Sequence, residues 1–250
     1  MIDSVIIQSM LFFLFILGTI IGSFLNVLGL RWDSKDFGGR SWCPHCSTTL
    51  RWFELVPIFS FLIQKGRCRG CGAKISYQYP IIEILTGLIF ATVPLWMLPM
   101  FCIYIVILIY DFHHKIIPDE LVYLAIALSV VSRWLLGGST LDWLAGPILF
   151  TFFASIWFFS RGRAMGFGDA KLGLSIGLLL GATHGFSAIV LAFWIGALAS
   201  LLYIFLTKTG FLKNSKGLTM RSEVPFAPFM IIGAWISLLL NLDLLHVVLF

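Results

Sequence analysis

Runs of apolar residues, most of them long enough to cross a lipid bilayer, constrain this chain more than any other feature. They cover residues 5–28, 80–97, 99–111, 120–136, 142–160, 171–183, 186–206 and 226–242, of which 99–111 and 171–183 are short. A hydrocarbon core of about 30 Å needs roughly 20 residues of helix. Because a helix satisfies its backbone hydrogen bonds within one segment, we predict an all-α polytopic membrane protein with about eight transmembrane helices.

The composition excludes an ordinary soluble domain. Apolar residues make up 59% of the 250 residues, and charged residues make up only 12%. A soluble domain carries about twice that share of charged side chains. The first apolar run exceeds the apolar core of a secretory signal, and only Asp3 brings a charge before it. We therefore expect a permanent helix whose N-terminus lies outside the cytoplasm.

The positions of the basic residues predict the orientation of the spans. With eight spans, every Lys and Arg except Arg133 falls on the same side of the membrane. Basic loops face the cytoplasm, so both termini are expected outside it. The net charge of +5 arises from these loops, and it favours contact with anionic membrane lipids over binding of nucleic acid.

The charge pattern also divides the chain. Residues 1–29 are expected to form the first transmembrane helix, residues 30–79 a cytoplasmic insert, and residues 80–250 the rest of the membrane core. Within the insert, residues 51–63 are apolar but too short for a span, and they contain Glu54 and Pro57. We expect this segment to lie on the membrane surface, anchored by Trp52 and Phe53.

Four cysteines in the insert have the spacing of a zinc site. Cys43-Pro-His-Cys46 and Cys68-Arg-Gly-Cys71 are two Cys-x-x-Cys pairs about twenty residues apart. Two disulfides are the alternative, but stable disulfides are rare in the reducing cytoplasm. We therefore predict a structural zinc ion, since four thiolate ligands leave no open coordination position for a substrate.

Two aspartates near the ends of apolar runs, Asp111 and Asp169, are candidates for function. Asp169, in Gly-Phe-Gly-Asp-Ala-Lys, and Asp119, in Ile-Pro-Asp-Glu, each precede a predicted helix, where an acidic N-cap is the structural alternative. Asp111 ends a predicted helix, and a negative charge there opposes the helix dipole. Capping gives no reason for Asp111, so a functional role is favoured.

Asp111 and Asp169 would form an acid–base pair if they lay at the same depth. Two close carboxylates do not both ionise readily, so one can take a proton from water while the other donates to a carbonyl. Gly166 and Gly168 would let a substrate strand approach closely. Lys171 would bind an anionic group or simply extend to the membrane edge. A small transporter using intramembrane acids is the alternative function.

At these motifs the sequence resembles the prepilin peptidases, the type IV leader peptidase family of Gly-x-Gly-Asp aspartyl proteases. The resemblance covers nearly the whole chain. It rests on motif residues that share the family's order, namely Gly22, Ser23, Phe24, Leu25, Asn26, Arg31, Glu54, Pro57, Cys68, Cys71, Pro80, Glu83, Asp111, Asp119, Gly166, Gly168 and Asp169. One departure is Trp32-Asp33, where the family commonly has an apolar residue followed by proline.

The resemblance implies a protease of the bacterial inner membrane. Such an enzyme removes the basic leader of type IV prepilins or pseudopilins, including those of type II secretion, at the cytoplasmic face. Asp111 and Asp169 match the family's catalytic pair, which makes residues 80–250 the protease core and leaves Asp119 auxiliary at most. Many members also N-methylate the new N-terminus with S-adenosylmethionine, and the matching region here is the first loop with Glu54.

Overall fold

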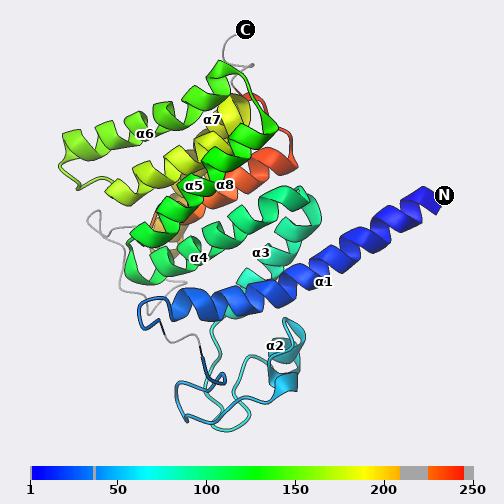
Figure 1. Ribbon diagram of the computed structural model, residues 1–250. Helices are drawn as coiled ribbons and strands as arrows, with labels where there is room; N and C mark the ends of the chain where they lie inside the picture. The colour runs from blue at the N-terminus through cyan, green and yellow to red at the C-terminus, as the bar shows by residue number, and fades with distance from the viewer. Residues whose placement is uncertain (1, 36–37, 209–224, 245–250) are drawn as a thin grey trace. The chain divides into compact units, whose positions relative to one another are not determined.

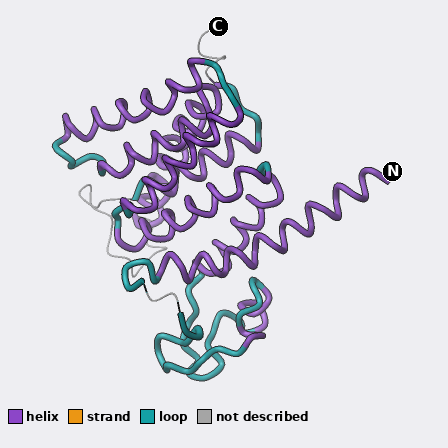
Figure 2. Tube along the Cα trace, viewed as in Figure 1, coloured by secondary structure: helices purple, strands orange, loops and turns teal. Residues whose placement is uncertain are grey.

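The computed structural model describes residues 2–35, 38–208 and 225–244 (Figure 1). Helices and loops make up all of this part of the chain, with no strand in it (Figure 2). The prediction of an all-α protein is therefore confirmed. The chain divides into two compact units, Met1–Ile109 and Tyr110–Phe250, which are described separately below.

The first unit is built on two helices that pack closely through glycine. Helix α1 spans Ile2–Leu30 and packs against α3, Gln78–Thr92. A Cβ atom added to Gly18 would lie only 2.7 Å from the Phe90 Cβ atom, and one added to Gly22 would lie 2.8 Å from the Thr86 hydroxyl oxygen. Small residues let helices approach where lipid supplies no hydrophobic drive. The short η2, Leu95–Met97, then leads into α4, Leu98–His114, whose last turn belongs to the second unit.

The insert between α1 and α3 has little regular structure. It contains the 3-10 helix η1, Trp52–Glu54, and the short helix α2, Phe59–Ile63. The buried carboxylate of Glu83 on α3 accepts the Ile58 N–H at 2.7 Å, which ties this segment to the helix. Trp52, Phe59 and other apolar side chains of the segment are exposed. Its location on a membrane surface stays a prediction.

The second unit is organised around α7. Helices α5, Asp119–Leu136, and α6, Thr140–Ser160, pack against α7, Phe167–Lys208, as does α8, Ala227–Leu239. Helix α6 begins with a capping box in which Ser139 and Asp142 bond each other's backbone N–H groups. The contacts of α5, α6 and α8 therefore fix α7 from several sides.

Helix α7 reverses its direction at Gly181. The backbone there has φ 77° and ψ −170°, which is not helical. A Cβ atom added to Gly185 would lie 3.4 Å from the Gly177 Cα atom, although residues eight apart in a straight helix are separated by about 12 Å. Residues 167–180 and 182–208 thus form a helical hairpin, close to the predicted runs 171–183 and 186–206.

The predicted count of eight spans is not confirmed. By length and composition, four helical segments in the described part of the chain qualify as membrane spans: Ile6–Leu30, Leu95–His114, Thr140–Ser160 and Phe167–Thr207. Helices α3 and α8 are apolar but shorter. The count of eight stays a prediction, and Lys213, Lys216 and Arg221, which contributed to the predicted orientation, lie outside the described residues.

Replacing Gly181 with alanine should destabilise the protein strongly. The backbone conformation is open essentially to glycine alone, at a cost of about 1–3 kcal/mol for another residue. The new Cβ atom would also collide with the Asp142 carboxylate. We expect Gly181→Ala to lower the melting temperature in detergent well below that of Gly185→Ala, whose Cβ atom would meet only ordinary contacts. Equal melting temperatures for the two variants would contradict the described reversal.

Candidate functional site

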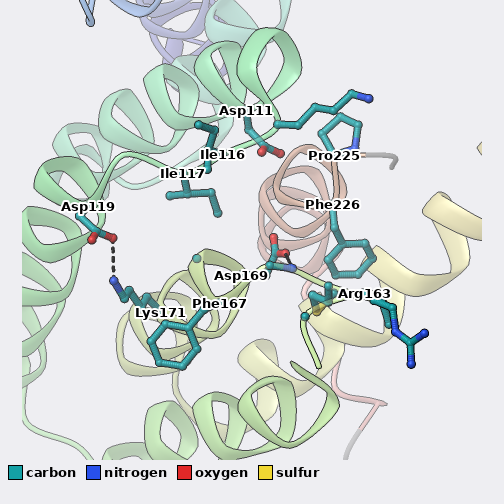
Figure 3. A pocket seen from close by; sticks show the side chains of 16 residues that line it. Asp111, Ile116, Ile117, Asp119, Arg163, Phe167, Asp169, Lys171, Pro225 and Phe226 are labelled. Atoms are coloured by element: carbon teal, nitrogen blue, oxygen red, sulfur yellow. Dashed lines mark hydrogen bonds and ion pairs between the residues drawn. The ribbon is translucent and has the colours of Figure 1, made fainter. Parts of the chain in front are cut away.

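A cavity of about 830 Å³ in the second unit contains both candidate aspartates (Figure 3). Its walls come from the end of α4, the link of residues 115–118, the loop of residues 162–166, the start of α7 and the residues just before α8. Every lining residue belongs to the second unit. The site can therefore be described within one compact body.

Asp111 reaches the cavity from the last turn of α4. Its side chain is 4% exposed, and within the described part of the chain its Oδ2 atom has no hydrogen-bond partner. The backbone N–H of Ala227, the first residue of α8, interacts with the carboxyl group. A buried carboxyl oxygen without a partner is costly, so this atom is available to a water molecule or a substrate.

Asp169 reaches the same cavity from the first turn of α7 and is 8% exposed. Its Oδ2 atom accepts the Gly166 N–H at 3.2 Å. Asp169 is thus the third residue of the helix rather than its N-cap, although it does bond the backbone before the helix. Figure 3 shows this carboxyl group and that of Asp111 directed into the cavity, and the two groups interact electrostatically.

This arrangement suits general acid–base chemistry on a bound peptide. Two nearly buried carboxyl groups that sense each other's charge hold one proton between them more readily than none. One group is then a proton acceptor for water and the other a hydrogen-bond donor to a carbonyl oxygen. The cavity is large enough for a segment of extended chain, since ligand pockets typically measure about 300–1,000 Å³.

The other predicted site residues also line the cavity, but two of them are already in close contact with neighbours. A Cβ atom added to Gly168 would lie 2.9 Å from the Ile117 Cβ atom, so the link of residues 115–118 packs against the start of α7. The Lys171 ammonium lies 2.6 Å from Asp119 Oδ1 and also faces the rings of Tyr123 and Phe167. Gly166 has more room, because its added Cβ atom would lie 3.5 Å from Asp169 Oδ2 and 4.0 Å from the Gly168 nitrogen, both ordinary contacts.

Sequence reasoning missed several residues of the cavity wall. Lys115, Ile117, Arg163 and Phe226 all line it. Ile117 lies between Asp111 and Asp119, so the spacing of the two acids could have indicated it. Phe226 belongs to no motif, and only the packing of α8 brings it to the site.

The four cysteines of the insert gather in one cluster within the first unit. Their sulfur atoms all lie within 4.8 Å of one another. The Cys43–Cys71 and Cys46–Cys68 sulfur pairs are 3.9 and 4.0 Å apart, close to the edge of about 3.8 Å implied by tetrahedral zinc with Zn–S bonds of about 2.3 Å. A disulfide would need about 2.05 Å. Hydrogen bonding with the Thr48 side chain and backbone lowers the pKa of Cys46 to about 6, whereas burial and the neighbouring thiols raise the pKa of Cys71 to about 11. Cys46 thus favours the thiolate that a metal binds.

Comparison with known proteins agrees with these two regions. Residues 16–97 match the bacterial peptidase A24 N-terminal domain, and residues 96–203 match the type IV leader peptidase family. The chain is 33% identical to a prepilin leader peptidase/N-methyltransferase of Bacillus subtilis (strain 168), with 92% of this chain and 94% of the relative covered.

Two further relatives show the same likeness. A prepilin leader peptidase/N-methyltransferase of Myxococcus xanthus (strain DK1622) is 50% identical over 80 residues, which are 31% of this chain and 24% of the relative. A type 4 prepilin-like proteins leader peptide-processing enzyme of Escherichia coli O78:H11 is 29% identical, with 86% of this chain and 88% of the relative covered. No solved structure matches the chain at a significant level.

The cysteine cluster should bind one zinc ion that stabilises the insert. We expect purified Cys68→Ser protein to lose most of its zinc, and its insert to be cut faster in limited proteolysis, because metal binding at such sites contributes directly to folding. Cys102→Ser is the matched control, since Cys102 lies outside the cluster. Zinc content and proteolysis rates that are equal in the two variants would rule the site out.

Proposed function

The chain belongs to the type IV leader peptidase family, and we propose that Asp111 and Asp169 are the catalytic pair with which it removes the leader of type IV prepilins or pseudopilins. Membership rests on the 33% identical relative, which aligns over 92% of this chain. The observation that carries the catalytic assignment is that both carboxyl groups, each less than one-tenth exposed, open onto the same cavity.

The proposed reaction needs only the two carboxyl groups and water. The ionised group takes a proton from the water molecule as its oxygen attacks the scissile carbonyl carbon. The protonated group donates a hydrogen bond to the carbonyl oxygen and stabilises the negative charge that develops there. The group that took the proton from water then gives it to the leaving amine as the C–N bond breaks. One carboxyl group is then again ionised and the other protonated. Burial strengthens these interactions because little water screens them.

Gly166, Gly168 and Lys171 are proposed to contact the substrate, because all three line the cavity beside the pair. Gly166 leaves the most space for a peptide backbone, whereas the space over Gly168 is filled by Ile117. The ammonium group of Lys171 is already paired with Asp119. Its aliphatic stem and the neighbouring rings of Tyr123 and Phe167 would therefore be the groups that pack against a substrate.

The apolar helices and the family imply a protein of the bacterial inner membrane. We propose the finer topology of eight spans, with both termini outside the cytoplasm and the insert inside it. Helix α4 ends and helix α7 begins at the candidate site, so both acids would lie at the cytoplasmic edge of the bilayer. The basic loops on that side would contact anionic lipids, and no role in nucleic-acid binding is proposed.

N-methylation of the new N-terminus is proposed as a second activity, supported by the names of the relatives in Bacillus subtilis and Myxococcus xanthus. S-adenosylmethionine would be the methyl donor. The Glu54 carboxylate, considered for this activity on resemblance, accepts the Arg51 N–H at 2.8 Å and closes a turn. That contact is structural and does not indicate a donor site, so no step of methyl transfer is assigned to named residues.

The transporter alternative is not supported. The relatives described above are named as leader-processing enzymes. Asp111 and Asp169 also meet in one cavity at helix ends, whereas an ion path would require acids at successive depths along the bilayer.

Removing either carboxylate should abolish cleavage. We expect Asp111→Asn and Asp169→Asn each to lower kcat for a purified prepilin by about 10³-fold or more, because an amide can neither take the proton from water nor replace the shared proton. Cleavage would be followed by gel electrophoresis, with zinc content and monodispersity as evidence of folding.

Glu120→Gln provides the control for these variants. Glu120 is an exposed acid on α5 next to Asp119, and it does not line the cavity. We expect it to keep near-normal kcat. Full cleavage by Asp111→Asn or Asp169→Asn would remove that residue from the pair.

Mass spectrometry of the cleaved prepilin should report both activities together. We expect the mass to fall by that of the leader without S-adenosylmethionine, and the product to gain about 14 Da, one methyl group in place of hydrogen, when the donor is present. Asp169→Asn should give neither product, since methylation requires the new N-terminus. A cleaved product that never gains mass with the donor would limit the activity to proteolysis.

A further inference from the structure

Three polar contacts link α5 to residues 167–180, the first half of α7. At one end Asp119 pairs with Lys171 at 2.6 Å. In the middle the hydroxyl groups of Ser129 and Ser175 are 3.0 Å apart, and both residues are fully buried. At the far end the Arg133 guanidinium donates to two carbonyl oxygens, those of Leu178 at 2.9 Å and Leu179 at 3.0 Å. Residues later in α5 contact residues later in α7, so the two helices run parallel.

The contact at the far end explains how the reversal at Gly181 is tolerated. Where a helix ends, its last carbonyl groups lose their partners within the helix. Arg133 bonds two of these carbonyl groups before the reversal, and the Asp142 carboxylate accepts the Ala182 N–H at 3.0 Å just after it. The backbone groups on both sides of Gly181 are thus hydrogen-bonded by side chains from α5 and α6, as apolar surroundings require.

These contacts fix how far the first half of α7 can move along its axis. A shift by one helical turn is about 5.4 Å, which would break all three contacts together. It would leave two buried hydroxyl groups and two carbonyl groups without these partners, and each such loss is destabilising. Such contacts maintain helix register where hydrophobic packing alone does not specify it.

The register matters because α7 carries Asp169 two residues before Lys171, whereas α5 is joined to Asp111 through residues 115–118. We propose that Ser129, Ser175 and Arg133 are positioning residues that hold Asp169 at the depth of Asp111. This inference rests on the proposed catalytic pair. None of the three lines the catalytic cavity, so each acts on the reaction only through the placement of α7.

The test measures kcat and KM for prepilin cleavage in four variants of the full-length protein in lipid nanodiscs. Arg133→Gln removes the contact at the far end, and the double variant Ser129→Ala/Ser175→Ala removes the one in the middle with little change in volume. Arg133→Lys keeps a charged donor. Ser155→Ala is the matched control, since the half-buried Ser155 hydroxyl donates to the Phe152 carbonyl within its own helix, α6.

Positioning predicts a loss in kcat rather than in KM. We expect Arg133→Gln and the double serine variant each to lower kcat by about tenfold or more with KM within about twofold, because misplacing a reacting group by about 1 Å has effects of this size. Arg133→Lys should recover to within about threefold of the unchanged protein, since one ammonium can still bond a carbonyl. Ser155→Ala should leave both constants unchanged.

Two outcomes would overturn the proposal. One is unchanged kcat in the double serine variant, which is expected to fold even if Arg133→Gln does not. The other is a fall in the amount of active enzyme with normal kcat per active site, which is the mark of a purely structural role. Asp169→Asn is assayed alongside: if it cleaves normally, the proposed function itself fails, whereas its inactivity with unaffected positioning variants rejects the positioning role alone.

Discussion

The need to satisfy backbone polar groups away from water governs the architecture of the second unit. A helix ends only where its last carbonyl and first amide groups find partners. At Gly181 those partners are the side chains of Arg133 and Asp142, so the chain can reverse within an apolar environment. The reversal places residues 182–208 beside residues 167–180 and leaves the start of α7 at the cavity lined by Asp111 and Asp169. The site therefore depends on hydrogen bonds made at the other end of the helix.

At the cavity, by contrast, a buried polar group lacks a hydrogen-bond partner in the part of the chain that the structure describes. Asp169 has one bond from Gly166, and within the described residues Asp111 Oδ2 has none. A structural acid in such surroundings would normally be surrounded by donors. Leaving the Asp111 Oδ2 atom without a partner is destabilising. In the proposed mechanism, water or a substrate would supply the missing hydrogen bond. If Asp111 is catalytic as proposed, the protein gives up stability at the position where the reaction takes place.

Much of the architecture could be predicted from apolar runs, because helices in lipid leave a strong signal in sequence. The runs 171–183 and 186–206 even separate near the reversal at Gly181. The cysteine cluster followed from spacing. Ile117 over Gly168 and Phe226 in the cavity wall could not be predicted, because their places depend on how α8 and the link before α5 pack. The pattern of residue types along one sequence does not reveal such contacts between segments that are far apart in the chain.

Arg133 shows why an exception to a sequence rule can be informative. It is the one basic residue that the charge pattern assigns to the outer side of the membrane, and on composition alone it looks unfavourable. Its guanidinium carries several donors in a rigid plane, which suits two adjacent carbonyl groups better than a lysine ammonium does. The favourable bonds to Leu178 and Leu179 offset the unfavourable position. A basic residue that the charge pattern places on the outer side can therefore indicate a helix reversal elsewhere in the chain. Its partners are carbonyl groups next to a glycine, as at Gly181.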